Sequence, residues 1–164
     1  MTNRISLLLL LFITLVFGAC SASKEGRGMK QTINGNWTLK TVDVQGINTR
    51  FKATVFNEAD YNCFVGSSWN FISNNSIGTY TLAPNTGCPS LTRTIRWSIY
   101  EPKGEEKRFQ FKRLDDKRNP VDNNDGFRLS IAQLTATDMQ LTSSISFEGK
   151  PATIVYNFVR TNGQ

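Results

Sequence analysis

The residues of this chain that could do covalent or acid-base chemistry are Cys20, Cys63 and Cys88, thirteen acidic side chains, and its lysines and tyrosines; histidine is absent from its 164 residues. Without histidine, no Ser-His or Cys-His pair can activate a nucleophile, and imidazole metal sites are excluded. The acidic residues lie mainly in polar or turn-like stretches such as 101–106 and 115–125, without the apolar neighbours that raise a carboxyl pKa. We therefore expect a protein that is not an enzyme and holds neither a metal nor a cofactor.

The amino end of the chain places Cys20 directly after an apolar run. Arg4 is followed by the mainly apolar stretch 7–19, which ends on two small residues. A membrane-spanning helix needs about 20 apolar residues, so this shorter run predicts an export signal that is removed. The motif Phe17-Gly18-Ala19-Cys20 resembles the lipobox of bacterial lipoproteins, with phenylalanine where leucine is usual. The resemblance implies a signal peptide at 1–19 and a lipidated Cys20; the alternative is an ordinary signal peptide with an incidental cysteine.

Lipidation of Cys20 would leave Cys63 and Cys88 as an even pair of thiols in an exported protein. Oxidising compartments favour disulfides, so we expect these two cysteines to form one. Two buried free thiols are the alternative. A zinc site is not expected, because two cysteines without histidine or a second pair do not complete a tetrahedral site.

The segment 20–34, rich in Ser, Gly, Lys and Arg, follows the apolar run and reads as a flexible tether. Together with the lipobox it predicts a protein of the cell envelope, anchored to a membrane that we expect to be the outer membrane of a Gram-negative bacterium. Either the periplasmic or the surface side is compatible with these residues. The net charge of +6 is spread along the chain, and export and the lack of RNA-binding motifs argue against a nucleic-acid partner.

From residue 35 onward, apolar residues recur with a period of two, which is typical of half-buried strands. Ile95, Trp97 and Ile99 alternate with polar residues, as do Phe109 and Phe111. Further alternating runs are found at 37–45, 50–55, 67–73, 76–82, 127–131, 138–147 and 151–160. The only helix that the pattern suggests is a short turn from Asn57 to about Phe64.

Eight or nine strands without long crossover helices must pair antiparallel. They form either two stacked sheets or a closed barrel, and closure removes exposed edges. We expect an all-β fold: an antiparallel, eight- to nine-stranded up-and-down barrel with at most one short helix, in a single domain over 35–162.

Two separated motifs carry a more specific resemblance. Gly35-Asn36-Trp37 at the start of the first strand resembles the Gly-x-Trp signature of lipocalins, and Arg160 lies where that family has an arginine on the tryptophan. Such stacking of a guanidinium on an indole would close one end of the barrel. The segment 57–69, Gly78-Thr79-Tyr80 and Cys88 look like the small lipocalin-like domains of Bacteroidetes lipoproteins. The resemblance implies a barrel that binds a small hydrophobic ligand.

The alternation also selects candidate ligand-lining residues on the inward faces of the strands. They are Trp69, Phe71, Trp97, Phe109, Phe111, Phe127, Tyr156 and Phe158. Small barrels either fill their interior with such side chains or leave room for one apolar ligand, and both alternatives stay open. Arg93 and Arg113 fall on inward positions of the same alternation. They are therefore either groups at the mouth of the barrel that pair with an acidic headgroup, or residues at strand ends where the alternation no longer holds.

A second hypothesis comes from the outward basic residues. Arg96, Arg108, Lys112 and Arg128 lie on neighbouring strands and would form a cationic face. In that case the chain would be a non-enzymatic accessory or structural envelope lipoprotein that binds lipid headgroups, an acidic glycan or a protein partner through its outer surface.

Overall fold

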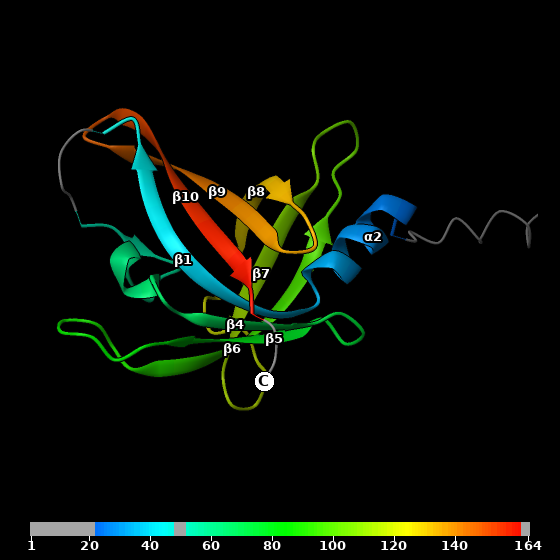
Figure 1. The fold of residues 1–164 in the computed structure, drawn as a ribbon, viewed down its shortest axis with the longest axis horizontal. Helices are drawn as coiled ribbons and strands as arrows, with labels where there is room; N and C mark the ends of the chain where they lie inside the picture. Colours follow the sequence, from blue (N-terminus) through cyan, green and yellow to red (C-terminus); the bar gives the residue numbers. More distant parts are fainter. Residues whose placement is uncertain (1–21, 48–51, 162–164) are drawn as a thin grey trace, which may run out of the picture.

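The computed structural model of the chain describes residues 22–47 and 52–161. Eight antiparallel strands form a closed barrel in the order β1-β10-β9-β8-β7-β6-β5-β4 (Figure 1). Their bounds are β1 Gly35–Gln45, β4 Ser68–Ile72, β5 Ile77–Leu82, β6 Leu91–Tyr100, β7 Arg108–Leu114, β8 Phe127–Leu134, β9 Asp138–Phe147 and β10 Lys150–Arg160. Strand β1 completes the barrel by pairing with both β10 and β4. The predicted closed up-and-down barrel, which is the architecture of lipocalins, is confirmed.

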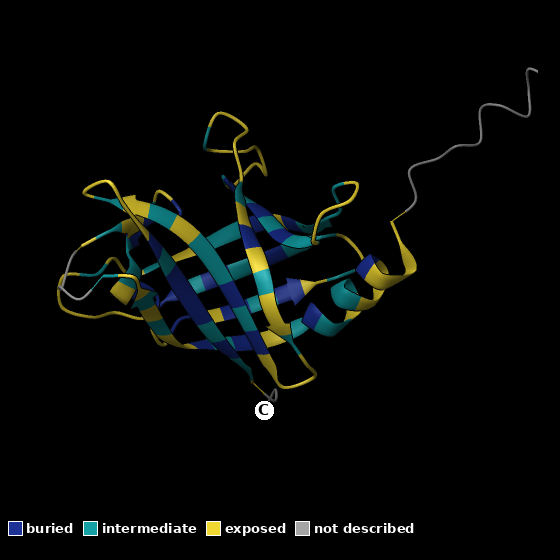
Figure 2. Ribbon diagram, turned by 90° about the horizontal axis from the view of Figure 1, so that it is seen from above, coloured by how far each residue is buried: buried dark blue, intermediate teal, exposed yellow. Residues whose placement is uncertain are grey.

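The register of the strands sends alternate side chains into the barrel. On β7, Phe109 and Phe111 are buried while Arg108, Gln110 and Lys112 are partly exposed, and Figure 2 shows buried and exposed bands that alternate along the strands. Each inward row packs against the inward rows of the other strands, so burial of aromatic area holds the register. A slip of one residue would turn these rings to solvent.

The two ends of the barrel carry different elements. The helix α2 (Lys24–Ile33) leads directly into β1 and lies at one end, which we call the base (Figure 1). At the other end, the mouth, lie β2 (Thr54–Val55), β3 (Ala59–Asp60) and the 3₁₀ helix η1 (Tyr61–Phe64), on the side opposite α2 (Figure 1). Strands β2 and β3 pair with each other as a separate hairpin. The run predicted at 50–55 therefore adds no strand to the barrel.

The helix α2 corrects the predicted tether, since most of 20–34 is ordered against the barrel. Ser23 caps it by accepting a hydrogen bond from the Gly26 backbone N–H at 2.9 Å, Glu25 pairs with Lys107 at 2.7 Å, and Ile33 is fully buried. A local cap and a few tertiary contacts therefore stabilise this helix. Within the described residues, no helix is long and apolar enough to cross a membrane. The predicted signal peptide and lipidated Cys20 lie outside the described residues.

The base is closed by the two motifs that carried the lipocalin resemblance. The Arg160 guanidinium lies 4.3 Å from the centre of the Trp37 ring, and Trp37 Nε1 donates to the Ile33 carbonyl at 2.7 Å. Arg160 also donates to the Asn34 carbonyl at 2.8 Å. Gly35 has a φ of 115°, and a Cβ there would lie 2.8 Å from Arg160 Nη1. This glycine is therefore required by both the backbone and the close approach of the arginine.

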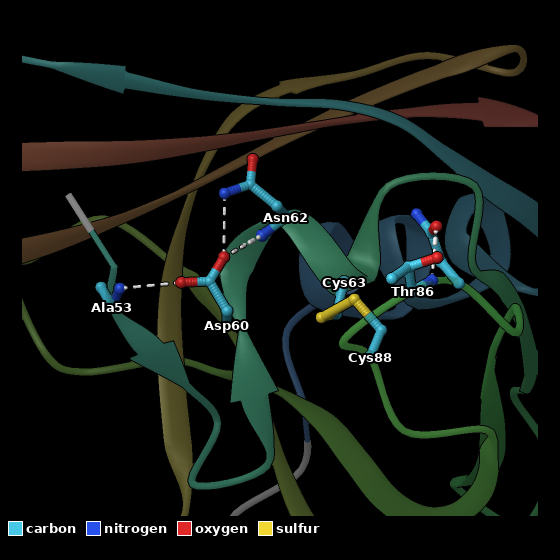
Figure 3. The surroundings of a disulfide bond; sticks show 7 residues. Ala53, Asp60, Asn62, Cys63, Thr86 and Cys88 are labelled. Carbon is cyan, nitrogen blue, oxygen red and sulfur yellow. Dashed lines mark hydrogen bonds between the residues drawn. A yellow bond between two sulfur atoms is a disulfide. The ribbon is translucent and has the colours of Figure 1, made fainter. Parts of the chain in front are cut away.

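A disulfide joins Cys63 to Cys88, as predicted, with a Cα–Cα distance of 5.4 Å (Figure 3). It ties η1 to the loop that follows β5. The residue that caps η1 is Asp60, whose side chain accepts from the Asn62 backbone N–H at 3.0 Å. The helix predicted from Asn57 is wrong over its first half, because the chain there makes the β2–β3 hairpin and turns helical only at Tyr61.

The disulfide gives a first testable prediction. A Cys63→Ala/Cys88→Ala double variant should unfold with a free energy about 3 to 4 kcal/mol lower, because the bridge closes a loop between residues 25 apart. Urea unfolding followed by tryptophan fluorescence measures this loss. Dithiothreitol should reproduce this loss in the natural chain and should leave the double variant unchanged. A natural chain whose unfolding midpoint dithiothreitol does not lower, or a double variant as stable as the natural chain, would contradict the assigned role.

Candidate ligand site at the barrel mouth

The centre of the barrel is filled by aromatic side chains. The Trp69 ring lies 4.6 Å from Tyr80 and 5.6 Å from Phe158, measured between ring centres. Of the predicted ligand-lining residues, Trp69, Phe71, Trp97, Phe109, Phe111, Tyr156 and Phe158 are buried and Phe127 is partly buried, all in one hydrophobic cluster. They form a packed core; Phe127 and Tyr156 also border a cleft at the mouth, and Trp97 and Phe111 border a groove on the outer wall. The filled interior is thus the alternative that describes this part of the barrel.

Phe56 enters the same cluster from the β2–β3 hairpin and acts as a plug. Its ring stacks on Tyr156 with 5.4 Å between centres and meets the Phe111 ring edge-on at 5.0 Å. Phe56 and Asn57 form the turn of the hairpin with positive φ values of 53° and 50°, which are uncommon for residues other than glycine. The strained turn persists because the buried ring and the hairpin contacts fix it.

An ion-pair cluster, which we call the latch, holds this hairpin to the barrel wall. Arg93 on β6 binds both oxygens of the Glu58 carboxylate, at 2.8 and 2.9 Å. Arg113 Nη1 on β7 lies 2.9 Å from Glu58 Oε2, and the Tyr80 hydroxyl donates to the same oxygen at 2.6 Å. Arg113 is itself paired with Asp122 through two hydrogen bonds of 2.9 and 2.6 Å. The turn residue Glu58 is therefore bound by three side chains of the barrel.

The latch carries its charges throughout the physiological pH range. Burial by itself raises the pKa of Glu58, but hydrogen bonds from Arg93, Tyr80 and Arg113 outweigh it, so the pKa falls from 4.5 to about 2. The hydrogen bonds from Arg113 likewise lower the pKa of Asp122. Burial, then the hydrogen bond to Glu58, raises the pKa of Tyr80. The ion pairs of the latch therefore hold the hairpin to the barrel at neutral pH.

The latch decides between the two alternatives for Arg93 and Arg113. Both arginines are mouth groups, and Arg113 is buried, but the acids that they bind are Glu58 and Asp122 of the same chain. Sequence reasoning did not identify either acid. The signal that could have found them was the inward parity of two arginines on neighbouring strands, because buried guanidinium groups require carboxylate partners.

A cleft of about 330 Å³ remains at the mouth, between the hairpin and strands β8, β9 and β10. Its apolar lining includes Val55, Phe56, Phe127 and Leu129. Small-molecule sites have volumes of about 300 to 1,000 Å³ and are mostly apolar with a few polar groups. The mouth cleft fits this description.

The polar lining of the mouth cleft includes two paired hydroxyl groups beside Asn57 and Arg128. The Ser143 and Tyr156 hydroxyls lie 3.3 Å apart, and burial raises the pKa of Tyr156 to about 12, with the Ser143 hydrogen bond acting in the opposite direction. Tyr156 is therefore a neutral hydrogen-bonding group at physiological pH. In the part of the chain that the structure describes, no group of three or more Cys, Asp and Glu side chains is placed to hold a metal ion.

Comparison with solved structures gives two bovine odorant-binding proteins among the similar chains. One, in complex with a selenium-containing odorant, is 8% identical, with 88% of this chain and 77% of that chain covered and a TM-score of 0.42. The other, from nasal mucosa, is 10% identical with the same coverage and a TM-score of 0.35. No family model matches the chain. No curated protein matches it either.

Proposed function

We propose that this protein is a lipid-anchored, lipocalin-like protein of the cell envelope that binds one small, largely apolar molecule at the mouth of its barrel. The observation that carries the proposal is the mouth cleft of about 330 Å³, with apolar side chains from the hairpin and β8 around it. Burial of apolar ligand surface provides the affinity, at about 25 cal/mol per Å² before the cost of association. The cleft sits beside the filled core and not inside it.

The lining also suggests the shape and polarity of the ligand. Phe127, Leu129 and Ile145 would contact apolar groups, while the paired hydroxyls of Ser143 and Tyr156 would bind one polar group. A ligand that reached farther into the barrel would have to displace the Phe56 ring. We therefore propose a small apolar molecule with a single hydrogen-bonding group.

The anchor part of the proposal rests on the lipobox resemblance and on the position of α2. Only residues 21–23 separate Cys20 from the first residue of α2 in the sequence, and that many residues span at most about 14 Å from Cys20 to Lys24. Because α2 lies at the base, an outer-membrane anchor on Cys20 would hold the base near the membrane and leave the mouth facing away from it. Acyl groups on an amino-terminal Cys20, read from the intact mass, test this part.

Ligand binding at the mouth cleft can be tested with a neutral fluorescent probe, N-phenyl-1-naphthylamine. Ser143 is partly buried on the inward side of β9 and lines the cleft, so Ser143→Phe should fill it and weaken probe binding about tenfold or more, equivalent to about 1.4 kcal/mol. Ser146→Phe, on the exposed outward side of the same strand, is the matched control and should bind as the natural chain does. Equal affinities for the two variants would contradict the proposed site.

A further inference from the structure

The outer wall of the barrel carries a groove that borders the mouth cleft and shares Gly126 and Arg128 with its lining. It has a volume of about 450 Å³ and lies over the outward faces of β6, β7 and β8, between Ser76 in the β4–β5 turn and the loop 124–126. Trp97 and Phe111 of the aromatic core also line it. Three basic side chains, Arg96, Lys112 and Arg128, line it together with a single acid, Asp125. Three positive charges less one negative charge leave an excess of +2.

Two of these basic residues are placed directly against each other. Arg96 on β6 is the cross-strand partner of Lys112 on β7, and like charges directly opposite on neighbouring strands destabilise a sheet. Lys112 Nζ donates to the neutral Asn124 Oδ1 at 2.7 Å. Arg96 is exposed, and within the described residues its guanidinium has no hydrogen-bonded or ion-paired partner. The pair is thus charged, uncompensated and accessible.

The third basic residue is held in a fixed position. The Arg128 guanidinium lies over the Tyr100 ring with 4.1 Å to the ring centre, and its Nε donates to Gln110 Oε1 at 3.2 Å. Gln110 Nε2 in turn donates to Ser98 Oγ at 2.9 Å. This row of stacking and hydrogen bonds orders the floor of the groove before any ligand arrives, which lowers the entropy lost on binding.

We propose that this groove binds an acidic saccharide. A carboxylate or sulfate group between Arg96 and Lys112 would remove their repulsion and accept charge-assisted hydrogen bonds from both. The neutral groups of Ser98, Gln110 and Asn124 match the hydroxyls of a sugar, which both donate and accept hydrogen bonds. The groove runs along the side wall from Ser76, which accepts a hydrogen bond from Lys30 of α2, to the loop 124–126. The neutral hydrogen-bonding groups along it favour a saccharide over a lipid headgroup.

Titration calorimetry of the full chain in detergent, with trigalacturonate and a sulfated trisaccharide as probes, tests this proposal. At least one acidic probe should bind, and its affinity should fall steeply with added salt. Arg96→Glu should weaken that binding at least tenfold. Lys40→Glu is the matched control, because Lys40 is exposed on β1 outside the groove and the variant changes the net charge equally. It should keep the affinity within about twofold.

Thermal unfolding provides a readout that a merely structural role would not give. Arg96→Glu replaces a like-charge pair with an opposite-charge pair facing Lys112, so its Tm should rise by roughly 1 to 4 °C while saccharide binding is lost.

Two further probes identify the source of the anion. Maltotriose, which is neutral, and glycerol phosphate, which represents a lipid headgroup, should both bind at least tenfold more weakly than the acidic saccharide.

Three results would overturn the proposal. They are the absence of binding by both acidic probes, an affinity that Arg96→Glu leaves unchanged, and glycerol phosphate binding as tight as that of the saccharide. The mouth-cleft variant Ser143→Phe should bind the saccharide normally, so failure at the groove and failure at the mouth are read separately.

Discussion

Glu58→Gln is expected to lower the free energy of unfolding by about 3 to 5 kcal/mol, the range observed when one partner of a buried ion pair is removed. The Glu58 side chain is 7% exposed, so the glutamine would leave Arg93 without its carboxylate and Arg113 with Asp122 alone. Glutamine has nearly the same shape as glutamate, so the loss of stability comes from the removed negative charge and not from a change in side-chain volume. Urea unfolding of both chains at pH 7 measures it.

The same substitution should make the free energy of unfolding depend less on pH below about pH 4.5. The pKa of Glu58 in the folded chain, about 2, is below its ordinary value of 4.5, so Glu58 stabilises the fold fully above pH 4.5 and loses this contribution as the pH falls toward 2. Glu105→Gln is the control, because Glu105 pairs with Arg108 while its side chain is 58% exposed; it should cost less than about 1 kcal/mol. Equal losses for the two variants would show that the latch does not hold the hairpin.

Phe56→Ala is expected to weaken the fold and to strengthen ligand binding. Removal of a buried phenylalanine side chain costs about 3 to 5 kcal/mol, and Phe56 is 8% exposed within the aromatic cluster. Because its ring also borders the mouth cleft, the space left behind would join the cleft. The affinity for N-phenyl-1-naphthylamine should then rise roughly tenfold, for about 1.4 kcal/mol of added apolar contact.

Phe109→Ala is the matched control for this prediction. Phe109 is 1% exposed in the same core but does not line the mouth cleft. It should lose a similar free energy of unfolding without gaining affinity for the probe. A gain in both variants would indicate non-specific binding to a loosened core, and a gain in neither would contradict the role of Phe56 as the plug.

Much of the barrel could be predicted from the sequence because its determinants are local and periodic. Alternating rows such as Phe109 and Phe111 define both the strands and their inward faces. The resemblance to the lipocalin signature predicted the contact of Gly35 and Trp37 with Arg160 at the base. With Cys20 set aside for lipid, the two remaining cysteines predicted the disulfide. Each of these depends on few residues whose chemistry allows few alternatives.

The elements that shape the site depend on contacts that are distant in sequence. Residues 24–33 are poor in apolar side chains, and their helix is stabilised by partners such as Lys107 that no local pattern reveals. The position of Phe56 as the plug depends on a turn with positive φ values. The sequence does not indicate this turn, because neither of its two central residues is a glycine. The latch joins Glu58 to arginines 35 and more positions away, so neither half indicates the other by spacing alone.

The most direct test of the proposed function is native mass spectrometry of the intact protein, extracted from the membranes of its own host in mild detergent. The account predicts a chain that begins at an acylated Cys20 and carries one additional small molecule, absent from Ser143→Phe and present in Ser146→Phe. A chain without a bound molecule, or a bound molecule that Ser143→Phe leaves in place, would contradict ligand binding at the mouth cleft.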